Sequence, residues 1–114
     1  MKRDYKLLIE DILDSMNKIE SFIGAMSFDE FMKDEKTKSA VVREIEVIGE
    51  ATKNIPETIR KRYGNLPWVD MARTRDKIIH FYFGVDYDIV WRVMKERLPE
   101  LKTSFEKILK EMEE

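Results

Sequence analysis

The stretch YKLLIEDILDSMNKIESFI, residues 5–23, indicates the fold class of this chain. Its apolar residues recur at intervals of three and four, which is the period of an α-helix with one face against a core. A helix ending near Gly24 is predicted, because glycine readily adopts the left-handed conformation that often follows a helix. The apolar face consists of Tyr5, Leu8, Ile9, Ile12, Leu13, Met16, Ile19, Phe22 and Ile23. No segment of the sequence has the two-residue alternation of a strand, so an all-α fold is expected.

Helical signals continue beyond this stretch. The sequence Ser27-Phe-Asp-Glu30 has the form of a capping box and predicts a short helix to about Lys33. A second long helix is predicted over roughly 36–53. Gly49 lies inside it, where glycine costs about 1 kcal/mol relative to alanine. Its presence suggests either close contact with another helix or space left for a ligand.

The second half of the chain is punctuated by prolines and glycines. Pro56 opens a short basic helix that ends before Gly64. A further helix is predicted over 67–84, since proline suits a first helical turn and glycine suits a C-terminus. The last helix is expected over 86–112, and Pro99 should kink it. The expected architecture is an up-down bundle of four main helices plus short helices.

Composition limits the class of protein. With 114 residues and 43% hydrophobic residues, the chain is expected to form a single packed domain over 1–114. It has no cysteine and one histidine, which argues against a disulfide framework, a thiolate nucleophile and a Cys- or His-built metal site. No apolar run is long enough to span a membrane, and the N-terminus lacks a signal-peptide core. A cytoplasmic protein without a membrane partner is expected.

Positive charge is concentrated in one part of the sequence. Six cations and two aspartates give residues 60–80 a charge of +4, which leaves −6 on the rest of a chain whose net charge is −2. A basic patch on an acidic body is compatible with contact to phosphates, but a solvated helix face has the same composition. The cations are Arg60, Lys61, Arg62, Arg73, Arg75 and Lys77.

The histidine, His80, lies in the run RTRDKIIHFYFG of residues 73–84. An imidazole can take and give a proton near neutral pH, although a lone histidine near a helix end is also often structural. On an ideal helix Asp76 and Arg73 share the face of His80, and Asp76 could then orient the imidazole. Arg75 points about 140° away, so it reaches the same site only through a long side chain or a loosened last turn.

These residue types suit cleavage of an RNA phosphodiester without a metal ion. A base is needed for the ribose 2′-hydroxyl, and cations are needed for the developing oxyanion. One histidine per chain leaves the role of the acid unfilled. A two-fold dimer that brings two copies of His80 together would supply it, or Tyr82 could act as a donor.

Four segments, taken in order, resemble the HEPN family of domains in its HepT-like version. Arg75 to His80 followed by Phe81-Tyr82 is similar to the family's Arg-x4-His-x-Tyr motif. The other three segments are Arg43-Glu-Ile-Glu-Val-Ile-Gly-Glu-Ala51, Pro67-Trp68 and Phe83-Gly-Val-Asp-Tyr-Asp-Ile-Val-Trp91. The resemblance implies an α-helical homodimer with the motif at a composite cleft and a metal-independent RNase toxin without a cofactor.

The resemblance also implies a partner, an MNT-type nucleotidyltransferase antitoxin that adds AMP to the motif tyrosine, here Tyr82. The RNA substrate would be a tRNA or an mRNA. In this hypothesis the catalytic residues are His80 as general base, Arg75 as phosphate and oxyanion clamp and Asp76 as orienting carboxylate, with Arg73 and Lys77 binding RNA phosphates.

Two questions stay open at the level of sequence. Arg43 and Glu50 are candidates for lining the cleft from the neighbouring helix, and a structural salt bridge is the alternative for them. The alternative function is a non-catalytic helical subunit that binds nucleotide or presents substrate in a nucleotidyltransferase complex. A purely structural helical dimer would leave the clustered charges around His80 unexplained.

Overall fold

The computed structural model describes residues 2–80 and 84–113; the side chains of residues 2–4 and of His80 lie outside the description. Within these ranges all elements are helical except two strands of two residues each, so the all-α prediction is confirmed. The elements are α1 (Lys2–Ile23), α2 (Phe28–Lys33), α3 (Glu35–Lys53), α4 (Glu57–Arg62), α5 (Trp68–Ala72), α6 (Thr74–Ile78), β1 (Ile79–His80), β2 (Gly84–Val85), α7 (Tyr87–Arg92), the π-helix η1 (Val93–Arg97) and α8 (Leu98–Glu113).

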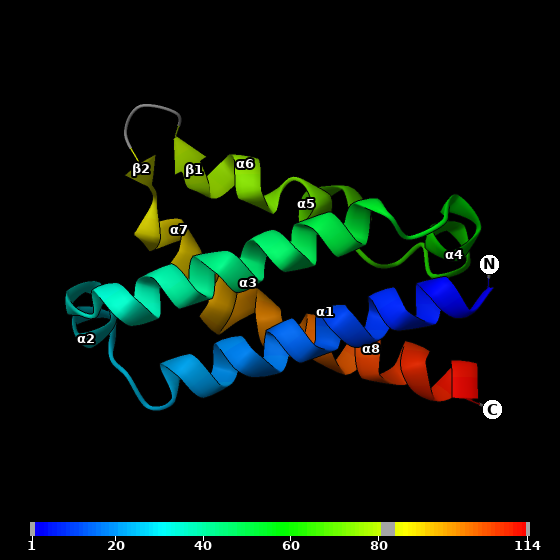
Figure 1. The fold of residues 1–114 in the computed structure, drawn as a ribbon, viewed down its shortest axis with the longest axis horizontal. Coiled ribbons are helices and arrows are strands. Elements are labelled where there is room, and N and C mark those ends of the chain that lie inside the picture. Colours follow the sequence, from blue (N-terminus) through cyan, green and yellow to red (C-terminus); the bar gives the residue numbers. More distant parts are fainter. Residues whose placement is uncertain (1, 81–83, 114) are drawn as a thin grey trace.

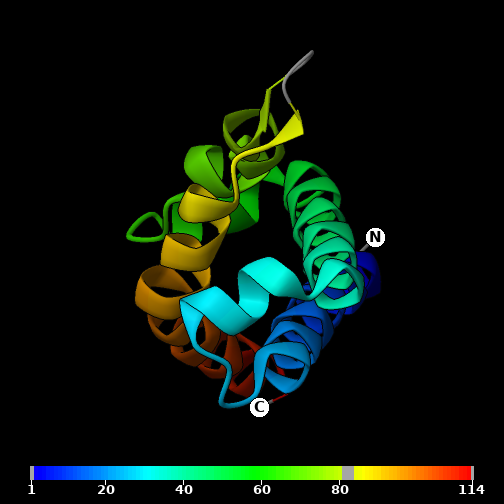
Figure 2. The same ribbon diagram turned by 90° about the vertical axis from the view of Figure 1, so that its left-hand side faces the viewer.

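The long helices enclose one core. Helix α1 packs along α3 and against α8 (Figure 1). The turned view shows α5 and α6 between α3 and α7 (Figure 2). Each fully buried aliphatic side chain contributes roughly 1.5–3 kcal/mol relative to exposure. Side chains without exposed surface include Ile9, Ile12, Met16, Ile19, Phe31, Val41, Ile78, Val90 and Phe105. Among the described helices, none is long and apolar enough to cross a membrane.

The first three helices end and begin where the sequence predicts. Gly24 follows α1 with φ of +51°, in the left-handed region. The capping box is formed, with the Ser27 amide donating to Glu30 Oε1 at 2.9 Å and the Glu30 amide donating to Ser27 Oγ at 3.1 Å. Gly49 marks a close helix contact, because a Cβ there would lie 3.6 Å from the main-chain oxygen of Ala72. The α5 segment can therefore approach α3 closely.

The prediction of one helix over 67–84 is wrong. Helices α5 and α6 are separated at Arg73, and α6 ends at Ile78. Ile79 has φ of −102° and ψ of 115°, an extended conformation that suits a β-branched residue. Gly84 does not follow a helix. It has φ of +81° and pairs with His80 across two antiparallel strands. The backbone of His80 thus belongs to a strand and not to the last turn of a helix.

Helices α7, η1 and α8 follow one another without a break from Tyr87 to Glu113. The Asp86 side chain caps the start by accepting from the Ile89 amide at 3.2 Å. Five π-helical residues come shortly before Pro99, and the Leu98 amide donates to the Val93 carbonyl, while the kink expected at Pro99 stays a prediction. Proline lacks an amide donor and its ring clashes with the preceding turn, so the wider π turn accommodates it.

Candidate active site

Helix α6 presents its side chains in different directions, because successive helical residues are turned by about 100°. Ile78 is fully buried and anchors the helix in the core. Arg75 lies toward α3, where its Nε donates to Glu46 Oε2 at 3.3 Å. Thr74 and Lys77 lie on the other flank and line a groove toward α7. The short helix therefore separates two surfaces, one at α3 and one at α7.

The ion pair between Arg75 and Glu46 holds the motif arginine at the protein surface. The two side chains are 51% and 36% exposed. Exposed ion pairs contribute about 0–1 kcal/mol to stability, so an incoming phosphate can replace the carboxylate at little cost. A guanidinium also offers several donors in a planar fork that matches a phosphate. Arg75 is thus oriented by Glu46 and still accessible to an anion.

Asp76 is placed on the solvent side of α6. Its carboxylate lies 3.8 Å from Nη1 of Arg75, and its side chain is 71% exposed. The expectation that Asp76 and Arg73 share a helical face with His80 is wrong, because the helix ends at Ile78 before reaching His80. The side chain of His80 is outside the description, so an orienting role for Asp76 stays a prediction.

The structure describes Arg73 but not Tyr82. Arg73 is exposed and lies at the break between α5 and α6, with φ of −99° and ψ of 1°. In the part of the chain that the structure describes, its guanidinium forms no ion pair. Tyr82, the expected acceptor of AMP, lies outside the described residues, and so does Phe81.

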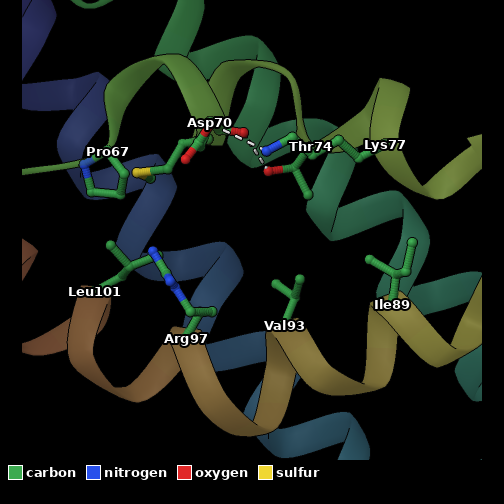
Figure 3. A pocket seen from close by; sticks show the side chains of 9 residues that line it. Pro67, Asp70, Thr74, Lys77, Ile89, Val93, Arg97 and Leu101 are labelled. Atoms are coloured by element: carbon green, nitrogen blue, oxygen red, sulfur yellow. Dashed lines mark hydrogen bonds and ion pairs between the residues drawn. The ribbon is translucent and has the colours of Figure 1, made fainter.

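Lys77 forms an ion pair on the α7 side of α6. Its Nζ donates to Asp70 Oδ1 at 3.1 Å, and Thr74 Oγ1 donates to the main-chain oxygen of Asp70 at 2.8 Å (Figure 3). The side chains of Lys77 and Asp70 are 53% and 66% exposed, so solvent screens their attraction. Lys77 can still bind a phosphate, but the Asp70 carboxylate competes with that phosphate for the ammonium group.

The two α3 residues selected from the sequence are not those that reach α6. Arg43 and Glu50 are both exposed, and neither forms a salt bridge among the described residues. Glu46 lies three residues after Arg43 and four before Glu50, hence on the same face of α3. Of the three, it is Glu46 that binds Arg75. A structural salt bridge of Arg43 or Glu50 is therefore not found among the described residues, and their role in lining the cleft stays a prediction.

A signal for Glu46 was present in the sequence. It lies one turn before Gly49, whose missing side chain lets the α5 segment approach α3. A carboxylate on that side of α3 faces the basic segment that packs there. The position of the glycine, combined with helical spacing, thus identifies Glu46 as a partner for an arginine of residues 73–77.

A family model and curated relatives that match this chain are all described as ribonucleases. Residues 12–108 match the family described as Ribonuclease HepT-like. A protein of Methanocaldococcus jannaschii named "Putative RNase MJ0127" is 46% identical over 112 residues, which cover 98% of this chain and 93% of that protein. A protein of Thermococcus cleftensis named "Probable ribonuclease HepT" is 47% identical over 110 residues, 96% of this chain and 100% of that protein. No solved structure matches the chain.

Proposed function

Because the chain belongs to the Ribonuclease HepT-like family, we propose that it is an endoribonuclease, the RNase toxin of a type II toxin–antitoxin pair. The observation that supports this most is the placement of Arg75. It is held at the surface by Glu46, with half of its side chain exposed, on the helix that leads directly into the strand of His80. An exposed arginine, with a histidine five residues further along the chain, provides the two kinds of group that phosphodiester cleavage needs.

The proposed reaction is transesterification followed by product release. His80 takes the proton of a ribose 2′-hydroxyl, and the 2′ oxygen attacks the neighbouring phosphorus. The bond from phosphorus to the 5′ oxygen breaks, and a second group protonates that oxygen. The products are a 2′,3′-cyclic phosphate and a 5′-hydroxyl end. Arg75 stabilises the charge on the non-bridging oxygens, which is the role that a metal ion has in other nucleases, while Arg73 and Lys77 bind neighbouring phosphates of the RNA strand.

The proton donor is the reason to propose a homodimer. One chain carries one histidine, so a two-fold dimer would place the second His80 opposite the first. Val69 supports a contact in this region, because it is a large apolar residue with 57% exposure, one helical turn before Arg73. Light scattering at micromolar concentration should give the mass of two chains. A strict monomer would contradict the composite site.

Control of the toxin is proposed to act through Tyr82 and an MNT-type nucleotidyltransferase antitoxin in the cytoplasm. The tyrosine oxygen would attack the α-phosphorus of ATP, releasing pyrophosphate and transferring its proton to a base of the transferase. The added phosphate would compete with RNA for Arg73 and Arg75. Peptide mass spectrometry after incubation with the transferase, ATP and magnesium should locate AMP on Tyr82. AMP found elsewhere would exclude this assignment.

Cleavage of labelled single-stranded RNA in EDTA tests the main proposal. His80→Ala and Arg75→Ala should each lower the rate by about 10²–10⁴, the usual loss for a general base or an oxyanion donor. Arg62→Ala is the matched control, since it removes an exposed arginine from α4 at the far end of the molecule (Figure 1). Cleavage that survives His80→Ala, or that requires a divalent metal, would favour the alternative of a non-catalytic subunit.

A further inference from the structure

A groove of about 230 Å³ lies on the α7 side of α6. One wall comes from α5 and α6, and the other from α7, η1 and α8 (Figure 3). Apolar side chains line much of it, among them Met71, Ile89 and Val93. Arg97 rises from η1 toward the opposite wall, between Val93 and Leu101 (Figure 3). The groove therefore combines an apolar surface with a guanidinium.

The polar groups of the groove leave one positive charge uncompensated. Lys77 and Asp70 neutralise each other at 3.1 Å. Arg97 is exposed and forms no ion pair with any residue that the structure describes. The Thr74 hydroxyl donates its proton to the Asp70 carbonyl, so its oxygen can accept a hydrogen bond from a ligand. The complementary ligand has a flat apolar face, hydrogen-bond donors at its edge and negative charge nearby.

The size of the groove favours a small planar group over a protein segment. Its volume of about 230 Å³ is below the roughly 300–1,000 Å³ of drug-sized ligand pockets. A partner helix would need apolar anchors spaced over several turns. A single nucleobase needs one apolar slot, and arginine planes commonly stack on unpaired RNA bases.

The position of the groove connects it to the candidate active site. Thr74 and Lys77 line the groove, and Arg75 lies on the other flank of the same helix. A helix with its side chains is about 10 Å across. An RNA strand with a phosphate at Arg75 could therefore cross α6 and place a neighbouring nucleotide in the groove.

Resting on the proposed ribonuclease function, we propose that this groove is a nucleobase subsite that binds one base beside the cleaved phosphate and gives cleavage a base preference. Arg97 stacks on the base, Met71 and Val93 contact its other face, and Thr74 accepts a hydrogen bond from its edge. RNA cleavage then depends on two surfaces of α6. Arg75 positions the phosphate, and the groove selects the nucleotide.

Direct binding tests the subsite without relying on cleavage. The methyl NMR signals of Met71, Ile89 and Val93 in the His80→Ala protein are followed while hexamers of uridine, cytidine or adenosine are added. We expect these signals to move, and to move most with one of the three bases. Arg97→Ala should weaken binding about tenfold, the loss expected for one stacked base. Arg97→Lys should not restore it, because lysine keeps the charge and lacks the plane.

Three outcomes would overturn the subsite. The methyl signals could stay fixed while Arg75→Ala still abolishes binding, which leaves the RNase proposal intact. Binding could be equal for all three bases and rescued by Arg97→Lys, which would show a phosphate contact only. The signals could instead follow protein concentration without RNA, which would identify the groove as an interface between copies. Failure of the wild-type protein to cleave RNA would contradict the proposed function, and the binding result would still decide on the groove.

Discussion

Replacing Gly49 by alanine should stabilise the protein. Alanine is favoured over glycine inside a helix by about 1 kcal/mol. A Cβ at this position would lie 3.6 Å from the Ala72 carbonyl oxygen and 3.7 Å from that of Met71, which is ordinary van der Waals contact. The free energy of unfolding should therefore rise by about 1 kcal/mol, with a rise in Tm of roughly 4 °C for a domain of this size. Urea denaturation followed by circular dichroism measures the free energy of unfolding. Both proteins are compared at the same concentration, because dimerisation shifts stability.

A larger side chain should have the opposite effect. The two methyl groups of Gly49→Val extend beyond Cβ toward the α5 carbonyls, and overpacking of this kind costs about 1–3 kcal/mol. The α5–α6 segment would then move away from α3, separating Arg75 from Glu46. RNA cleavage by Gly49→Val should fall, while Gly49→Ala should cleave at the wild-type rate.

Gly24 provides the matched control for the same chemical change. Its φ of +51° places it in the left-handed region, where a Cβ costs roughly 1–2 kcal/mol. Gly24→Ala should therefore destabilise the protein although it lies after a helix on the surface. If Gly49→Ala also lowered the free energy of unfolding by 1 kcal/mol or more, the contact between α3 and α5 would have to be tighter than the structure shows, and the argument would be refuted.

Three other substitutions test separate features. Arg75→Lys keeps the charge but loses the planar fork, so the initial rate of RNA cleavage should fall at least about tenfold. The free energy of unfolding in urea should stay within about 0.5 kcal/mol of the wild-type value. A wild-type cleavage rate would show that a point charge suffices. Lys38 is only 7% exposed, and its Nζ lies 4.5 Å from the Tyr87 ring centroid. In urea denaturation, Lys38→Ala should therefore lower the free energy of unfolding by about 2 kcal/mol, and Lys38→Met should lower it less because methionine retains the volume. Equal losses for the two variants would contradict this. Ser27→Ala removes the capping box and should lower the free energy of unfolding by about 1 kcal/mol, whereas no change would mean that water replaces the cap.

The first half of the fold could be predicted because its signals are local. The apolar period of residues 5–23 and the capping box at Ser27 act within one or two helical turns, so they depend little on the rest of the molecule. The left-handed helix end at Gly24 is confirmed. For Gly49 the sequence allowed either a close helix contact or space for a ligand, and the structure shows a contact with the α5 segment. The helix end and the capping box would hold in many different arrangements of the bundle.

The segment around His80 could not be predicted in the same way. Helices α5 and α6 have five residues each, too few for an amphipathic period to distinguish them from one longer helix. Their separation at Arg73 accompanies the packing of α5 against α3 at Gly49, which is a tertiary contact. The strand at Ile79 pairs with Val85, and the Asp86 amide donates to the Ile78 carbonyl. A tertiary contact with α3 and hairpin pairing with residues 84–86 therefore override helical periodicity here.

In the candidate site, the sequence likewise predicted which types of residue take part but not which residues contact one another. Residue chemistry selected Arg75 and the carboxylate Asp76, but the carboxylate that accepts a hydrogen bond from Arg75 belongs to Glu46, which is 29 residues away along the chain. Helix spacing brought Arg43 and Glu50 to the right face of α3 and could not say which residue of that face meets α6. The distance between α3 and the α5–α6 segment decides this, and a small residue at position 49 permits it.

The short length of α6 has a consequence for function. A five-residue helix is far below the roughly 12–15 residues at which isolated helices become even marginally stable. Its position therefore comes from its contacts, with buried Ile78 below, Glu46 on the α3 side, and the bond from the Asp86 amide at its end. An arginine held in this way can shift by small changes on either neighbouring helix. Substrate bound in the groove on the α7 side would thus act on the same element that carries Arg75, which provides a physical route from base recognition to phosphate positioning.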